Sequence, residues 1–114
     1  MKPQPKEKLA PRLGEFEEIV LLAILRLGEN AYGVPVRRLI EVETNRRASF
    51  GALYTTFDRL EKKGYISSRQ GGATTNRGGR SKRFLKVEGA GLEVLRWRQS
   101  GRTKMLSGLR PELA

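Results

Sequence analysis

Apolar residues recur at helical spacing through the first sixty residues of the chain. The first helix is predicted over residues 15–27, where one face carries Ile19, Val20, Ala23, Ile24 and Leu27. Three glutamates occupy its first turn, where negative charge suits the positive end of the helix dipole. Leu22 and Leu25 widen the apolar face, which predicts a helix at the centre of the core.

Two further helices are predicted before residue 64. The second covers residues 34–43, and its inward face carries Val36, Leu39 and Ile40. Residues 44–48 form a polar connection, after which Ser49 is a typical N-cap for the third helix. That helix runs to about Lys63 and ends at Gly64, with an apolar stripe formed by Leu53, Phe57 and Leu60.

After residue 64 the spacing of apolar residues changes from a helical period to the alternation typical of strands. Residues 65–69 and 81–87 are predicted to pair as a β-hairpin, and the glycine-rich connection between them exceeds the usual hairpin loop length. A last helix is predicted from Glu88 to about Leu106. Gly101 costs about 1 kcal/mol relative to alanine inside a helix, which predicts a break there. The fold class is therefore mainly α with a small β-hairpin: a winged helix-turn-helix followed by a C-terminal helix.

Charge is concentrated in the predicted hairpin. The 114 residues carry a formal net charge of +11, and residues 62–87 contribute eight bases and no acid. This run contains Lys62, Lys63, Arg69, Arg77, Arg80, Lys82, Arg83 and Lys86. A local basic cluster of this kind favours a polyanionic partner, with nucleic acid ahead of a membrane surface.

Several classes of chemistry have no candidate residues. The chain has neither cysteine nor histidine, which excludes disulfides and removes the commonest metal ligands and general base. Its longest apolar run, residues 19–25, is too short to span a bilayer, and residues 1–14 lack the apolar region of a secretory signal. We therefore expect a cytoplasmic protein that is no enzyme, with no cofactor, no metal and no membrane partner.

The element order suggests how double-stranded DNA would be contacted. The third helix would enter the major groove and the basic wing would follow the phosphate backbone. The expected DNA-contacting residues are Ser49, Ala52, Tyr54, Thr55, Thr56, Arg59, Lys63, Arg77, Arg80 and Lys82. Ser49 also fits a purely capping role, Tyr54 fits core packing, and Thr55 and Thr56 fit solvated positions. Trp97 fits a core residue or a dimer seam.

Residues 14–91 resemble the PadR family of winged-helix transcriptional regulators. The residues that carry the resemblance are the apolar run 18–25, Ala31-Tyr32-Gly33, the segment 49–66 and the segment 77–84. The most specific of these is the Gly-x-Leu-Tyr-x-x-x-x-Arg-Leu-Glu-x-x-Gly pattern that begins at Gly51. The resemblance implies a dimeric DNA-binding regulator, usually a repressor.

The resemblance also assigns the C-terminal segment. Similar proteins dimerise through a C-terminal helix, which here implies a seam containing Leu92, Leu95, Trp97 and Leu106. The expected division is a flexible basic arm over residues 1–13, a DNA-binding domain over 14–87, and a dimerisation helix with tail over 88–114. The chain departs from the family where Glu88-Gly89 replaces a Thr-Pro-like helix start. Some members bind aromatic small molecules between subunits, and nothing in this chain establishes such an effector.

Two other functions use the same charge. The winged helix would also suit structured RNA, although the chain lacks exposed aromatic pairs for stacking on single strands. Alternatively, the wing would bind an acidic protein. Competition between duplex DNA and total RNA distinguishes RNA binding from DNA binding. Nucleic acid that co-purifies with the protein counts against binding of an acidic protein.

Overall fold

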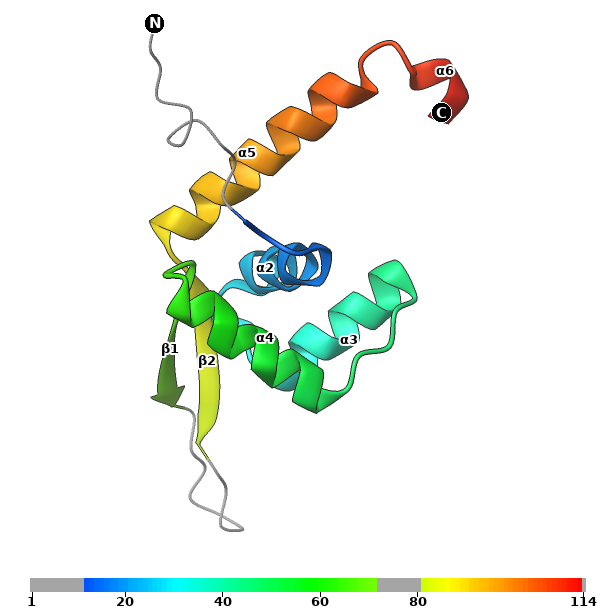
Figure 1. Cartoon of the computed structure of the whole chain (residues 1–114). Helices are drawn as coiled ribbons and strands as arrows, with labels where there is room; N and C mark the ends of the chain where they lie inside the picture. Colours follow the sequence, from blue (N-terminus) through cyan, green and yellow to red (C-terminus); the bar gives the residue numbers. More distant parts are fainter. Residues whose placement is uncertain (1–11, 72–80, 114) are drawn as a thin grey trace, which may run out of the picture.

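The fold is described from a computed structural model over residues 12–71 and 81–113. Its elements, in chain order, are α2 (Glu15–Leu27), the 3-10 turn η1 (Gly28–Asn30), α3 (Gly33–Thr44), α4 (Phe50–Lys62), β1 (Ile66–Gly71), β2 (Lys82–Val87), α5 (Gly89–Leu106) and α6 (Arg110–Leu113). In Figure 1, α2 lies at the centre, α3 and α4 cover one side, and α5 crosses the other. This arrangement confirms the predicted winged helix-turn-helix with a C-terminal helix.

The core forms around α2, which contacts α3, α4, β2 and α5. Val20, Leu21 and Ile24 of α2 pack there with Leu53 and Phe57 of α4, all of them fully buried or nearly so. The prediction that this helix lies at the centre of the core is confirmed, although Leu22 and Leu25, which widen its apolar face, are 47% and 46% exposed. They border shallow grooves, Leu22 next to α3 and Leu25 next to the hairpin.

Both ends of α4 follow the predicted signals. The Ser49 hydroxyl accepts a hydrogen bond from the Ala52 amide at 3.0 Å, which satisfies a backbone donor in the first turn. At the other end, Gly64 has φ of +81°, a left-handed conformation that favours glycine. The helix that carries the candidate contacts is thus fixed at both ends by local chemistry.

The two strands pair antiparallel from Ile66 opposite Val87 to Gly71 opposite Lys82. The hairpin is attached to the body through the Leu85 amide, which donates to the Ala31 carbonyl at 2.9 Å, just before α3. Residues 72–80, which include the predicted wing tip, lie outside the described part of the chain. The attachment fixes the base of the hairpin beside the helix-turn-helix.

The structure corrects two predictions about the C-terminal helix and one about the N-terminal arm. The helix runs through Gly101 to Leu106 without a break, because a penalty of about 1 kcal/mol is too small to end a helix. Leu95 is 8% exposed and belongs to the core of the single chain, so it is not available as a dimer contact. Leu13 is also buried, so the N-terminal arm cannot extend to residue 13, and residues 1–11 lie outside the described part.

Candidate nucleic-acid interface

One side of α4 is exposed along its whole length. It presents Gly51, Ala52, Thr55, Asp58, Arg59 and Lys62, which we call the α4 face. Small and hydroxyl-bearing residues occupy its first half, and charged residues occupy its second half. Such a surface lets a helix approach base edges closely at its N-terminal end, with cations further along for the backbone. Of the predicted contacts, Ala52, Thr55 and Arg59 lie on this face.

The other predicted residues of α4 are placed differently. Thr56 is 4% exposed, and its hydroxyl donates to the Ala52 carbonyl at 2.8 Å, so it is not a DNA contact. Its position between Thr55 and Phe57 turns it toward the core, a result that periodicity could have shown. Ser49 is exposed but its hydroxyl serves as the N-cap.

Tyr54 is half-exposed and packs mainly against protein. Its ring stacks on Phe50, with centroids 6.0 Å apart, and meets Phe57 edge-on at 5.7 Å. Its hydroxyl lies over Gly33, so close that a Cβ there would be 2.7 Å away. Tyr54 therefore holds α4 against the start of α3, and only the exposed part of its ring remains for a ligand.

The turn between α3 and α4 depends on Arg37, which lies outside the apolar face predicted for its helix. The Arg37 Nε donates to the Ala48 carbonyl at 2.7 Å, one residue before the N-cap Ser49. Its guanidinium also lies over the Phe50 ring, 4.7 Å from the centroid. Arg37 thus fixes the angle at which α4 leaves the turn, a long-range role that helical spacing alone does not reveal.

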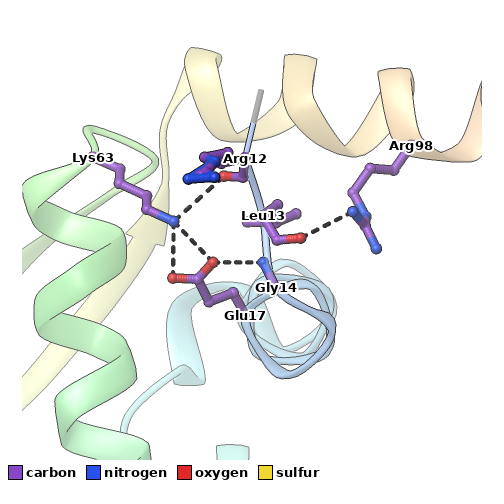
Figure 2. A network of polar contacts seen from close by, with 6 residues as sticks. All are labelled: Arg12, Leu13, Gly14, Glu17, Lys63 and Arg98. Carbon is purple, nitrogen blue, oxygen red and sulfur yellow. Dashed lines mark hydrogen bonds and ion pairs between the residues drawn. The ribbon is translucent and has the colours of Figure 1, made fainter. Parts of the chain in front are cut away.

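Lys63 was expected to contact DNA, but its ammonium group is engaged within the protein. It lies 2.9 and 3.0 Å from the two carboxylate oxygens of Glu17, and 3.4 Å from the Arg12 carbonyl (Figure 2). Burial raises the pKa of Glu17, but the Gly14 amide and the Lys63 ammonium outweigh it and hold the pKa below its ordinary value. Glu17 is therefore ionised at neutral pH, and Lys63 belongs to this pair.

A second ion-pair cluster joins the hairpin to α4. The Arg83 guanidinium of β2 lies 3.0 Å from Asp58 and 2.8 Å from Glu61, both on α4. Glu61 also accepts a hydrogen bond from the Ser68 hydroxyl of β1 at 2.9 Å. The hydrogen bond from Arg83 lowers the pKa of Glu61, and the hydrogen bond from Ser68 lowers it further by a smaller amount. We call Asp58, Glu61, Ser68 and Arg83 the wing clamp.

From the wing clamp we expect Arg83→Gln to lower the stability of the fold but not to change the salt dependence of DNA binding. The charge of Arg83 is already balanced by two carboxylates, so it should release no counterion from DNA. We expect a stability loss of about 1 kcal/mol or less, because the pairs are partly exposed. The salt slope of DNA binding should stay unchanged. Thermal denaturation and binding titrations across salt concentrations measure both, and a slope smaller by about one would show a phosphate contact instead.

The remaining bases of the hairpin and of the last turn of α4 are better placed for a polyanion. Within the described residues, Lys62, Arg69, Lys82 and Lys86 take part in no ion pair. The Lys82 ammonium lies over the Tyr32 ring, 5.1 Å from its centroid, and Arg69 lies over Phe84 at 4.7 Å. The predicted contacts Arg77 and Arg80 lie outside the described residues.

The predicted dimer residues separate into two groups. Trp97 is 42% exposed and Leu106 is 37% exposed, whereas Leu92 is half-buried and Leu95 lies in the core. Trp97 is thus not a core residue of the single chain, which was one of its two expected roles. Met105, Leu109 and Leu113 add further exposed apolar side chains toward the C-terminal end.

Other kinds of site are not apparent where side chains are described. Across residues 12–71 and 81–113, no three histidine, cysteine, aspartate or glutamate side chains come together as a metal site would require. Among the same residues, no helix is both long and apolar enough to cross a membrane. The α4 face and the adjoining hairpin therefore remain the candidate site.

The fold and this surface define a winged helix-turn-helix protein. Residues 21–96 match the family described as "Transcriptional regulator PadR-like family", which covers more than half of the chain. The chain therefore belongs to the PadR-like family of transcriptional regulators, and it is a DNA-binding transcription regulator. No match was found among curated proteins.

Solved structures share the fold. A PadR family transcription regulator from Clostridium difficile has a TM-score of 0.67 and 19% identity over 87% of this chain and 99% of its own. A PadR-like transcriptional regulator from Bacillus cereus has the same TM-score and identity over 86% of this chain and 90% of its own. A Streptococcus transcriptional regulator has a TM-score of 0.60 and 21% identity over 96% and 99% of the two chains.

Proposed function

We propose that this regulator binds a specific double-stranded DNA site as a homodimer and acts as a repressor. In this proposal α4 enters the major groove and the basic hairpin follows the neighbouring phosphates. The observation that carries it is the α4 face, which is small and uncharged where base edges would be met. Further along it carries Arg59 and Lys62, and its one acid, Asp58, is paired with Arg83. The repressor role rests on the family resemblance.

The homodimer is supported by apolar surface at the C-terminal end. Trp97 and Leu106 of α5 are exposed together with Met105, Leu109 and Leu113. Exposed apolar side chains along one terminal segment are available for association of chains. A cytoplasmic location suits the cysteine-free sequence. The expectation that the chain lacks an exposed aromatic pair is wrong, because Phe50 and Tyr54 are both exposed and their rings stack. RNA binding therefore remains an outcome of the test below.

The proposal is tested by gel shift with DNA from upstream of the protein's own coding sequence. We expect this DNA to be bound more tightly than a random duplex at physiological salt, because base contacts add to the phosphate contacts. Equal affinity for both would contradict specific binding. Displacement by total RNA at lower concentration than by duplex DNA would favour an RNA-binding role instead.

The role of the wing is tested separately by its salt dependence. Arg77→Ala and Arg80→Ala should each weaken binding to every duplex and reduce the salt slope by about one. The expected effect is uniform, because phosphate contacts carry no sequence information. Titrations at several salt concentrations measure it. A slope unchanged by both substitutions would remove the wing tip from the proposed interface.

A further inference from the structure

Two cations from different helices hold the same short segment of chain. From the C-cap of α4, Lys63 pairs with Glu17 and reaches the Arg12 carbonyl. From α5, Arg98 donates to the Leu13 carbonyl at 3.0 Å and pairs with Glu18 at 3.0 Å. Figure 2 shows the segment from Arg12 to Glu17 between these two helices. We call the contacts of Lys63 and Arg98 with residues 12–18 the polar junction.

The segment between the two cations is itself held rigidly. The Glu17 carboxylate accepts a hydrogen bond from the Gly14 amide at 2.7 Å, which closes the first turn of α2. Leu13 is buried, and the carboxylates of Glu17 and Glu18 are largely shielded from solvent. A charge pair that is shielded in this way is weakened little by salt. The segment therefore joins the end of α4 to α5 through contacts that are largely shielded from solvent.

Arg98 is the last point at which α5 is attached to the body of the domain. The first point lies at the start of the helix, where the Glu88 amide donates to the Tyr65 carbonyl at 2.9 Å and Gly91 packs against the same carbonyl. Arg98 follows Gly91 by two turns, about 10 Å along the helix. Between these two points Val94 and Leu95 are buried in the core, so the contacts of Arg98 are the last ones that hold the helix before its exposed part.

The geometry of Arg98 is consistent with a positioning role. Both of its terminal nitrogens are used, while its buried Nε has no hydrogen-bond partner within the described part of the chain. Leaving a buried donor unpaired is unfavourable. The two contacts with residues 13 and 18 offset this cost and hold the side chain in place. Beyond Arg98, residues 99–109 are exposed, and nothing else in the described chain orients the rest of α5.

We propose that Lys63 and Arg98 are positioning residues that fix the direction of α5 relative to α4 through the polar junction. In a dimer joined through α5, that direction sets the separation of the two copies of α4. Lys63 and Arg98 would thereby select the half-site spacing of the DNA without contacting it. The effect on half-site spacing rests on the proposed function. The effect on the direction of α5 relative to α4 does not depend on it.

The geometric part is tested on the free protein. The chain has no cysteine, so Thr55→Cys and Ser100→Cys introduce the only two sites for nitroxide labels, one on α4 and one on α5. Double electron–electron resonance, with labelled chains diluted into unlabelled ones, then gives the α4–α5 distance distribution. We expect Lys63→Met and Arg98→Met each to broaden or shift it. The control Arg26→Met removes an exposed pair with Glu43 and should leave it unchanged.

The DNA part uses two-fold symmetric duplexes whose half-sites are moved apart by one base pair. We expect Lys63→Met and Arg98→Met to reduce spacing discrimination by about three- to tenfold, with affinity for an isolated half-site and the salt slope unchanged. If the Lys63→Met variant does not fold, the double variant Glu17→Gln, Lys63→Met takes its place in both measurements. The glutamine carbonyl still accepts the hydrogen bond from the Gly14 amide, and no unpaired charge is left.

The outcomes separate the two proposals. A wild-type protein without spacing preference would contradict the proposed dimer on DNA, and the distance distributions would still decide the geometric part. A wild-type preference that both variants retain, with unchanged distance distributions, would overturn the inference and leave the proposed function standing. A salt slope lowered by about one in Lys63→Met would instead identify Lys63 as a phosphate contact.

Discussion

Ala52→Glu is expected to abolish specific DNA binding without loss of stability. Ala52 is exposed on the α4 face, three residues after the N-cap Ser49. Glutamate at that position completes a capping box with the serine, which favours the helix. The same carboxylate would face the DNA, where like charges brought together cost several kcal/mol, so we expect at least about a 100-fold loss of affinity. Fluorescence anisotropy with labelled duplex and thermal denaturation measure the two effects.

The matched control is Ala52→Gln, which has the same size and the same capping geometry but no charge. It should retain stability and lose much less affinity than Ala52→Glu. Equal losses for the two variants would show that bulk matters at this position and charge does not. Unchanged binding by Ala52→Glu would place the DNA contact on a surface other than the α4 face.

Gly91→Ala is expected to destabilise the fold by about 1–3 kcal/mol, the usual cost of overpacking a core. A Cβ at this buried position would lie 2.4 Å from the Tyr65 carbonyl oxygen and 2.8 Å from a methyl group of Val87. The carbonyl cannot turn aside easily, because it also accepts the hydrogen bond from the Glu88 amide. The start of α5 would have to move away from the hairpin. Urea denaturation measures the loss.

Gly101→Ala is the control on the same helix. No atom outside the helix lies within 4 Å of the position where its Cβ would be built, and the helix continues through it. Alanine should therefore stabilise α5 by about 1 kcal/mol. Opposite signs for the two glycine substitutions would support the packing account of Gly91. A neutral effect of Gly91→Ala would mean that α5 does not sit as closely against Tyr65 as the structure shows.

Local signals predicted the elements well. The N-cap at Ser49, the stop at Gly64 and the apolar stripe from Leu53 to Leu60 depend on neighbours along the chain, and the structure has all three where they were expected. The break at Gly101 was wrong because a single glycine carries too small a penalty to end a helix. Thr56 was wrong because a hydroxyl group on the core side can bond to its own helix.

Long-range pairing could not be predicted in the same way. The sequence shows eight bases without an acid between residues 62 and 87, yet Lys63 pairs with Glu17 and Arg83 pairs with Asp58 and Glu61. These partners lie outside the basic run, and only the packing of α2, α4 and the hairpin brings them together. Part of the apparent phosphate-binding charge therefore holds the domain in shape.

The most direct test of specific recognition by α4 is a binding comparison at physiological salt. Duplexes enriched from a random pool by the purified protein would be titrated against shuffled duplexes of the same composition. The account predicts an enriched two-fold symmetric site, half-sites one or more helical turns apart, and a preference of about 10³ or more over shuffled DNA. No enrichment, or equal affinity for enriched and shuffled duplexes, would contradict it.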